Sequence, residues 1–385
     1  MQPFQFHTTR SIVFREGAAA DLAGLAGRIL GPRVLVVTDP GIRMLGLADR
    51  AIASLTASGA ACTVFDAVEA DPSLATLMRA VEAGREARVT GVLGFGGGSP
   101  MDVAKLVALL LGSGEALEEA WGVGNAKGPR LPLVLVPTTA GTGSEVTPVA
   151  IITVGEEEKR GVSSPAILPD LAVLDATLTL GLPANVTAPT GIDAMVHAIE
   201  AYASASPNNN PLSRMRAREA LRLLGANIKT AVFDGSDLRA RGAMLLGAML
   251  AGQAFANSPV AAVHALAYPL GGTFHIPHGL SNALVLPHVL RFNLPEAAGA
   301  YAEIAGDAFP ALLRVADEVR AEAFVEALAA LARDLKMPVR LRDAGVPESA
   351  IGKLAADAMK QERLLVNNPR RLTQDDALSI YRAAW

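Results

Sequence analysis

The fold is decided by the stretch VTGVLGFGGGSPMDVAKLVALLL, residues 89–111. Its first half is a short apolar run that leads into glycines, and its second half is apolar with helical spacing. This order predicts a buried strand followed directly by a helix. Ser99, Pro100 and Asp102 have the order of an N-cap, a first helical position and a capping box, so we expect the helix to begin there. The glycines suit either a tight turn or backbone N–H groups that approach a phosphate at the helix N-terminus.

Strand-like runs alternate with helical segments on both sides of this stretch. The other clear runs are RVLVVTD (33–39), ACTVFDAV (61–68), LPLVLVPTT (131–139) and AVLD (172–175). Such alternation predicts a parallel sheet covered by helices on both faces. Helical periods dominate after residue 182. We therefore predict an α/β fold with an N-terminal parallel-sheet domain at residues 1–182 and an all-helical C-terminal domain at residues 183–385.

Length and composition narrow the class of protein. The chain has 385 residues, which is more than one hydrophobic core usually supports, and 51% of them are hydrophobic. The net charge is −4 and there is no Lys/Arg-rich run, which argues against a nucleic-acid partner. The single cysteine, Cys62, fits a reducing compartment. The N-terminus lacks the apolar core of a secretory signal, and the longest apolar stretch (242–272) contains polar residues and two prolines. We expect no membrane span and a cytoplasmic location.

Two polar loops follow neighbouring strands. GFGGGSPMD (94–102) and VPTTAGTGSEVTP (136–148) combine glycines with hydroxyl side chains. Loops at the carboxyl ends of parallel strands commonly form a ligand crevice, so together they favour a nucleotide. Asp39 ends an earlier strand, almost 60 residues before the glycines, which is not the order of the standard dinucleotide fingerprint.

An acid and an imidazole stand one helical turn apart in TGIDAMVHAIEAYAS, residues 190–204. Asp193 and His197 are four residues apart and therefore point in the same direction from an otherwise apolar helix. A surface hydrogen bond or a satisfied pair in the core would leave this pattern. A pair of metal ligands would leave it too.

Four of the six histidines lie between residues 264 and 288. We expect His264 on a helix, a turn at the glycine pair 271–272, and His278 at the start of the next element. This order can bring His264 and His278 together. With the earlier acid and imidazole they would make one carboxylate and three imidazoles, a donor set that suits Fe²⁺, Zn²⁺ and similar ions.

Several long motifs resemble the iron-containing (group III) metal-dependent alcohol dehydrogenase family. They are GGGSPMDVAK, PTTAGTGSEVT, LPDLAVLDATLTLGLPANVTAPTGIDAMVHAIEAY, HALAYPLGGTFHIPHGLSNALVLPHVLRFN and NNPRRLTQDD. The resemblance runs from near the N-terminus to the last predicted helix. It implies a dinucleotide-binding N-terminal domain, a helical metal-binding C-terminal domain and a metal in the cleft between them. The implied reaction transfers a hydride between a small alcohol and its aldehyde or ketone, with NAD(H) as cofactor.

The resemblance also assigns residues. The implied metal ligands, for Fe²⁺ first and Zn²⁺ second, are Asp193, His197, His264 and His278. The implied cofactor residues are Gly97, Gly98 and Ser99 at the pyrophosphate, Thr138, Thr139 and Thr147 along the groove, Lys159 near the nicotinamide ribose and Asp39 at the adenine ribose.

Two positions depart from the family pattern. Tyr268 stands where many members have a histidine credited with proton transfer, and Asp71 stands where members usually have an asparagine. We expect Tyr268 near the substrate and His275 near the metal ligands. Tyr268, Phe255 and Val149 are the predicted pocket walls, which suggests a small and fairly apolar alcohol.

Three alternatives stay open at this point. A maleylacetate reductase-like enzyme would work without metal, but the four possible ligands are all present. A dehydroquinate synthase-like lyase would need basic residues for a phosphorylated substrate, and none stands next to the ligand motifs. A non-catalytic metal-binding or assembly protein would not need two cofactor loops. We expect a small alcohol or aldehyde as partner and a homo-oligomer, most simply a dimer.

Overall fold

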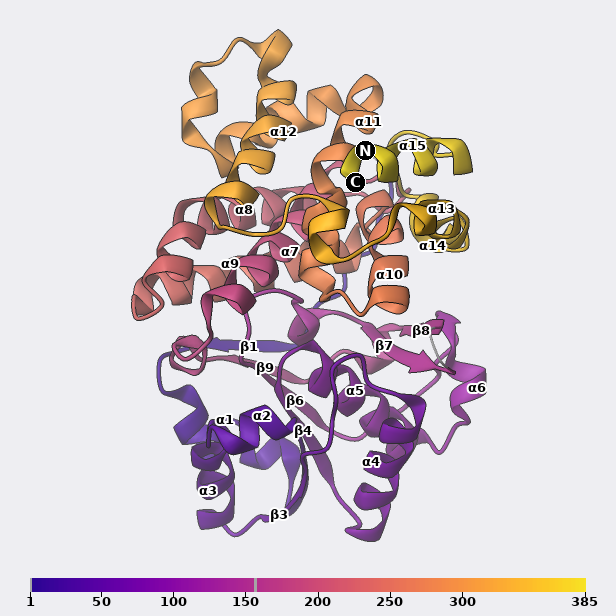
Figure 1. The fold of residues 1–385 in the computed structure, drawn as a ribbon. Helices are drawn as coiled ribbons and strands as arrows, with labels where there is room; N and C mark the ends of the chain where they lie inside the picture. The colour runs from indigo at the N-terminus through magenta and orange to yellow at the C-terminus, as the bar shows by residue number, and fades with distance from the viewer. Residues whose placement is uncertain (1, 156–157) are drawn as a thin grey trace. The chain divides into compact units, whose positions relative to one another are not determined.

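Strand β4 (Gly91–Gly96) occupies the middle of a parallel sheet in which the central strands are buried (Figure 1). The computed structural model describes residues 2–155 and 158–385. Within them this sheet has six strands in the order β1-β9-β6-β4-β2-β3, and every pair is parallel. The other strands are β1 (Ser11–Phe14), β2 (Arg33–Val37), β3 (Ala61–Phe65), β6 (Leu133–Pro137) and β9 (Leu171–Leu174).

Alternate residues of the strands face two separate cores. Leu35 pairs with Val92 in the register of β2 and β4, and both belong to one core; Val36 and Leu93, one residue on, belong to the other. The first core includes α4 (Leu74–Glu86) and α5 (Gly98–Ser113), and the second includes α1 (Leu22–Leu30) and α3 (Asp49–Ala57). Helices therefore cover both faces, which explains why the strands are continuous apolar runs. The predicted α/β sheet is confirmed.

A second, smaller sheet was not predicted. It has the order β5-β8-β7 and contains β5 (Gly122–Val123), β7 (Val149–Val154) and β8 (Glu158–Ser163). Strand β8 reads EKRGVS, and a run this polar lacks the hydrophobic alternation from which strands are recognised. Within its described residues, this part of the chain also contains the short helices α2 (Pro40–Met44) and α6 (Leu117–Ala120) and four 3-10 helices.

The predicted capping box at the start of α5 is wrong. The helix begins at Gly98 with Gly97 as its N-cap, and no side chain caps it. The Asp102 carboxylate instead accepts hydrogen bonds from the Ser144 hydroxyl at 2.6 Å and from the Ile151 N–H at 2.9 Å. These partners lie more than 40 residues away, so tertiary contacts outweigh the local capping pattern.

The packing divides the chain into two units. One, called here the sheet unit, is His7–Gly181; the other, the helical unit, consists of the N-terminal segment up to Phe6 together with Leu182–Trp385. From Leu182 onward the described elements are helical, as predicted. The α-helices are α7 (Ala184–Ala203), α8 (Pro211–Phe233), α9 (Leu238–Asn257), α10 (Ala262–Phe274), α11 (His278–Ala308), α12 (Asp317–Asp334), α13 (Ile351–Ala358), α14 (Glu362–Leu365) and α15 (Gln374–Ala384).

None of the described helices has the length and apolar character needed to cross a membrane. The apolar stretch 242–272 forms most of α9 and α10, and much of both helices is buried within the helical unit.

Candidate functional site

Helix α7 carries the first two predicted ligands through the interior of the helical unit. Every residue from Gly191 to Tyr202 is buried. Asp193 and His197 are therefore inside the protein, one turn apart. A buried polar group costs several kcal/mol unless it is paired, so both side chains require partners. The interpretation of this pair as a surface hydrogen bond is wrong.

Helices α10 and α11 bring two further histidines to the same place. His264 lies in the first turn of α10, and His278 is the first residue of α11. The chain reverses at His275, whose φ of 55° is unusual for a residue other than glycine. The predicted turn at Gly271 and Gly272 is wrong, because both lie inside α10.

A glycine allows α11 to start close to α7. A Cβ on Gly279 would lie 2.4 Å from the carbonyl oxygen of Pro189 in α7, so only glycine fits at this position. The residue before it is His278. The close approach of the two backbones therefore sets the His278 imidazole against the helix that carries Asp193.

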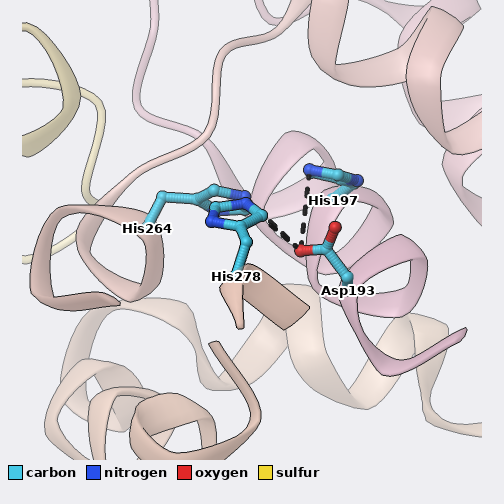
Figure 2. A group of neighbouring side chains, drawn as sticks. All are labelled: Asp193, His197, His264 and His278. Atoms are coloured by element: carbon cyan, nitrogen blue, oxygen red, sulfur yellow. Dashed lines mark ion pairs between the residues drawn. The ribbon is translucent and has the colours of Figure 1, made fainter. Parts of the chain in front are cut away.

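The four side chains point toward one another (Figure 2). Their possible ligand atoms all lie within 4.8 Å of one another. Measured from Asp193 Oδ1, the Nε2 atoms lie at 3.9 Å for His197, 3.9 Å for His264 and 3.6 Å for His278. Two ligand atoms about 2.1 Å from one ion at the tetrahedral angle would be about 3.4 Å apart. The three distances from Asp193 Oδ1, at 3.6–3.9 Å, are about 0.2–0.5 Å above that value.

The electrostatic surroundings keep Asp193 charged. Burial alone would raise its pKa, but the imidazoles of His197, His278 and His264 and a hydrogen bond from Asn282 together hold the pKa below its usual range. An ionised carboxylate is the form that binds a metal ion. The group is open to solvent at His278. The side chain of His278 is 42% exposed, while the side chains of the other three residues are almost completely buried.

Asn282 lies among the ligand atoms and was missed by the sequence analysis. Its amide nitrogen donates to Asp193 Oδ1 at 2.6 Å and lies 3.3 Å from the Nε2 atoms of His264 and His278. Within the described part of the chain, its buried carbonyl oxygen makes no hydrogen bond. Rotation of the amide would exchange nitrogen and oxygen and present the oxygen to the same ligand atoms, where a cation would be its natural partner. The residues present therefore fit a divalent metal ion.

Two other side chains contact the imidazoles. Phe255 of α9 stacks on the His197 ring with centroids 4.4 Å apart. Glu200, one turn after His197 on α7, contacts Nδ1 of His264 at 2.6 Å. Glu200 was missed, although its spacing of three residues from His197 places it on the same helix face.

The two tentative substrate residues, Tyr268 and His275, differ in burial. Tyr268 is half-buried one turn after His264, and its ring centroid lies 6.0 Å from that of His278. His275 is exposed at the end of α10. Their proposed roles beside the substrate and the metal ligands stay predictions.

The cofactor loops come together in the sheet unit. Asp39 follows β2, and its Oδ2 would lie 3.2 Å from a Cβ built on Gly96 at the end of the neighbouring β4. Thr139 follows β6, and its hydroxyl oxygen would lie 3.7 Å from a Cβ built on Gly97. Gly97, Gly98 and Ser99 are half-buried at the N-terminus of the 16-residue helix α5, and Thr138 is buried next to Thr139. The adjacent N–H groups and helix dipole suit an anionic phosphate.

Two predicted cofactor residues have other partners. The Lys159 ammonium lies 2.6 Å from the Asp71 carboxylate and donates to the Thr153 hydroxyl at 3.0 Å. Thr147 is buried, and its hydroxyl accepts a hydrogen bond at 3.2 Å from Lys105, a fully buried lysine of α5. Burial lowers the pKa of Lys105.

Two models of one enzyme family match most of the chain. The description "Iron-containing alcohol dehydrogenase" matches residues 9–176, and "Fe-containing alcohol dehydrogenase family, C-terminal" matches residues 187–385. The chain is also 40% identical over 373 residues to the long-chain-alcohol dehydrogenase 1 of Geobacillus thermodenitrificans (strain NG80-2), covering 96% of this chain and 93% of that protein. The chain belongs to the iron-containing alcohol dehydrogenase family.

Solved structures agree with this assignment. A 1,3-propanediol oxidoreductase has a TM-score of 0.95 at 34% identity, covering 100% of both chains. The sulfoacetaldehyde reductase of Bifidobacterium kashiwanohense, solved in complex with NAD⁺, has a TM-score of 0.88 at 29% identity, covering 100% of this chain and 99% of that one. The predicted fold and the predicted alcohol dehydrogenase activity are confirmed.

Proposed function

We propose that the chain interconverts a small alcohol and its aldehyde or ketone with NAD(H), using a divalent metal held by Asp193, His197, His264 and His278. The observation that carries this proposal is the buried set of four ligand atoms within 4.8 Å of one another. One carboxylate and three imidazoles suit both Fe²⁺ and Zn²⁺. Fe²⁺ is the first candidate because the family is iron-containing, and Zn²⁺ is the second.

The chemistry divides between the bound groups and the chain. When bound, a divalent cation supplies Lewis-acid polarisation of a hydroxyl or carbonyl oxygen, and NAD⁺ supplies the hydride acceptor. The Asp193 carboxylate contributes negative charge that offsets the ion. The exposed side of His278 leaves an approach for a substrate oxygen, and Tyr268 is positioned to contact that substrate.

The sheet unit is proposed to hold NAD(H). The N-terminus of α5 at Gly97, Gly98 and Ser99 would receive the pyrophosphate, with Thr138 and Thr139 alongside. We keep Asp39 as the residue at the adenine ribose. Thr147 and Lys159 stay candidates for the cofactor groove.

The natural substrate is proposed only as a class. Similar proteins are named for a long-chain alcohol, for 1,3-propanediol and for sulfoacetaldehyde, so the family tolerates different chain lengths and charges. We expect a small alcohol, aldehyde or ketone without phosphate. A homo-oligomer and a cytoplasmic location remain part of the proposal.

Metal removal tests this function. Prolonged chelation should abolish the change in NADH absorbance with a panel of alcohols and aldehydes, and Fe²⁺ or Zn²⁺ should restore part of it. Elemental analysis should find one divalent ion per chain in the active enzyme. A fully active enzyme in which elemental analysis finds no metal would overturn the proposal and favour the maleylacetate reductase-like alternative.

A further inference from the structure

Glu200 is the third polar residue on the buried face of α7, and no role has been assigned to it. It follows Asp193 by seven residues and His197 by three, so all three side chains leave the helix in similar directions. Only 5% of Glu200 is exposed. A buried carboxylate of this kind needs hydrogen-bond donors for both of its oxygens.

Both oxygens find their donors at the start of α10. Oε1 accepts the backbone N–H of Val263 at 2.7 Å, and Oε2 lies 2.6 Å from Nδ1 of the next residue, His264. The first N–H groups of a helix lack partners within the helix, and no side chain at the N-cap position supplies one here. Glu200 therefore caps α10 from another helix and holds the His264 ring by the same carboxylate.

These two contacts decide which nitrogen of His264 carries the hydrogen. An ionised carboxylate only accepts hydrogen bonds, so Nδ1 must be the donor. In the neutral ring, Nε2 then keeps its lone pair. Nε2 is the atom that faces Asp193, at 3.9 Å.

We infer that Glu200 is a positioning residue, which fixes the tautomer and the ring orientation of His264 so that Nε2 can bind the metal. The inference rests on the proposed metal site. It does not require Glu200 to contact the metal or the substrate. Metal-binding histidines commonly donate their second nitrogen to a carboxylate, and loss of that partner typically weakens metal binding by about 10- to 100-fold.

The substitution Glu200→Gln separates this role from simple packing. The amide has nearly the same shape, but it can accept through only one of its two ends. If the oxygen faces the Val263 N–H, the amide nitrogen donates to Nδ1 and forces the hydrogen of His264 onto Nε2. If the oxygen faces His264, the amide nitrogen meets the Val263 N–H, donor against donor. Neither orientation reproduces the wild-type arrangement.

The experiment measures Zn²⁺ affinity of the metal-stripped full-length enzyme against a competing chelator. Glu200→Gln should weaken binding by about 10- to 100-fold. Glu303→Gln is the control, because the exposed Glu303 also accepts a hydrogen bond from α7, but from the Tyr202 hydroxyl and not from a ligand. It should leave Zn²⁺ affinity unchanged. In a His264→Ala background, Glu200→Gln should have less than about a twofold further effect, because its influence passes through that ring.

A measurement on the wild type keeps the inference testable if the variant does not fold. Nitrogen-15 spectra of labelled histidines in the Zn²⁺-loaded enzyme should show a hydrogen on Nδ1 of His264. A hydrogen on Nε2, or an unchanged Zn²⁺ affinity in Glu200→Gln, would overturn the role of Glu200 alone. Failure of the wild type to bind Zn²⁺ at all would instead overturn the proposed metal site on which the role depends.

Discussion

Two polar clusters in this chain surround a carboxylate with different groups. In the sheet unit, the Lys105 ammonium donates to the Ser144 hydroxyl at 2.7 Å and to the Val149 carbonyl at 2.6 Å, and the Asp102 carboxylate lies 3.5 Å away. In the helical unit, the groups that act on the Asp193 carboxylate are three imidazoles and the amide of Asn282. The first cluster contains its own cation. The second gathers ligand atoms around a carboxylate, which is the arrangement that receives a cation from outside.

A structural cluster and a set of metal ligands differ in the groups that surround the carboxylate. Each cluster contains polar side chains that are almost completely buried, Lys105 in one and Asp193 in the other, so burial alone does not distinguish the clusters. The distinguishing feature is the chemical type of the neighbours, because a lysine pairs with a carboxylate directly, whereas imidazole nitrogens are potential metal ligands. The following substitutions should therefore affect the two clusters in opposite ways, one through metal and activity and the other through stability.

The largest effect is expected for Asp193→Asn. The amide keeps the shape of the side chain but loses the charge that offsets the ion. We expect kcat to fall by about 10⁴-fold, more than about 5 kcal/mol of transition-state stabilisation, together with lost metal. Circular dichroism should show an intact fold. Elemental analysis and kcat measure the outcome, and near-normal values of both would reduce Asp193 to an acid on a helix face.

Lys105→Met should destabilise the fold and spare the metal. Removing one partner of a buried ion pair leaves the other uncompensated, so the free energy of unfolding should fall by about 3–5 kcal/mol. Urea unfolding at pH 7 measures it. As a control, Lys229→Met breaks an exposed pair with Asp334, at 2.7 Å, and should cost less than about 1 kcal/mol. A Lys105→Met enzyme that keeps its stability but loses metal would erase the difference between the clusters.

The sequence predicted what depends on periodicity and missed what depends on tertiary neighbours. Apolar runs identified the central parallel strands because those strands are buried on both faces. The strand β8 was missed because it contains no such run. Asp102 matched a capping pattern locally, but its donors come from Ser144 and Ile151. At the candidate site, family motifs supplied the four ligands. Glu200 and Asn282 were missed because the ligands that they contact at 2.6 Å, His264 and Asp193, lie 64 and 89 residues away in the sequence.

Glu145, which interacts with Lys105, should make the free energy of unfolding depend on pH. Burial raises the pKa of the neighbouring Glu145 to about 7. The folded chain therefore keeps a proton that the unfolded chain releases near pH 4.5, so the wild type loses stability as pH rises from about 4.5 to about 7. Glu145→Gln removes this group from the titration. Relative to the wild type, the variant should gain about 2–3 kcal/mol in unfolding free energy between pH 5 and pH 8.

Urea unfolding of both proteins at the two pH values measures this gain. Groups that titrate in both proteins cancel in the comparison, so the difference reports Glu145. A difference between variant and wild type that is the same at pH 5 and pH 8 would show that Glu145 does not titrate in this window.

The smallest effect is expected at Asp39. Like Asp193, this acid is proposed to bind a group that is not part of the chain, here the adenine ribose of NAD(H). Its Oδ1 accepts the Ile42 N–H at 2.9 Å and caps α2, while Oδ2 faces the end of β4 at Gly96. The nearest arginine in sequence, Arg43, is paired with Asp49 at 2.7 Å. A 2′-phosphate at this edge of the sheet would therefore meet negative charge.

We predict that the wild type prefers NAD(H) over NADP(H) by at least about tenfold in kcat/KM, which corresponds to about 1.4 kcal/mol. Asp39→Gly should shrink this ratio, because it removes like-charge repulsion from the 2′-phosphate. It also removes the cap of α2, so Asp39→Asn, which can still cap, separates charge from local stability. Both variants should shift the ratio toward NADP(H), and kcat/KM for the two cofactors measures it. A wild type that prefers NADP(H), or an unchanged ratio in both variants, would show that Asp39 does not contact the adenine ribose.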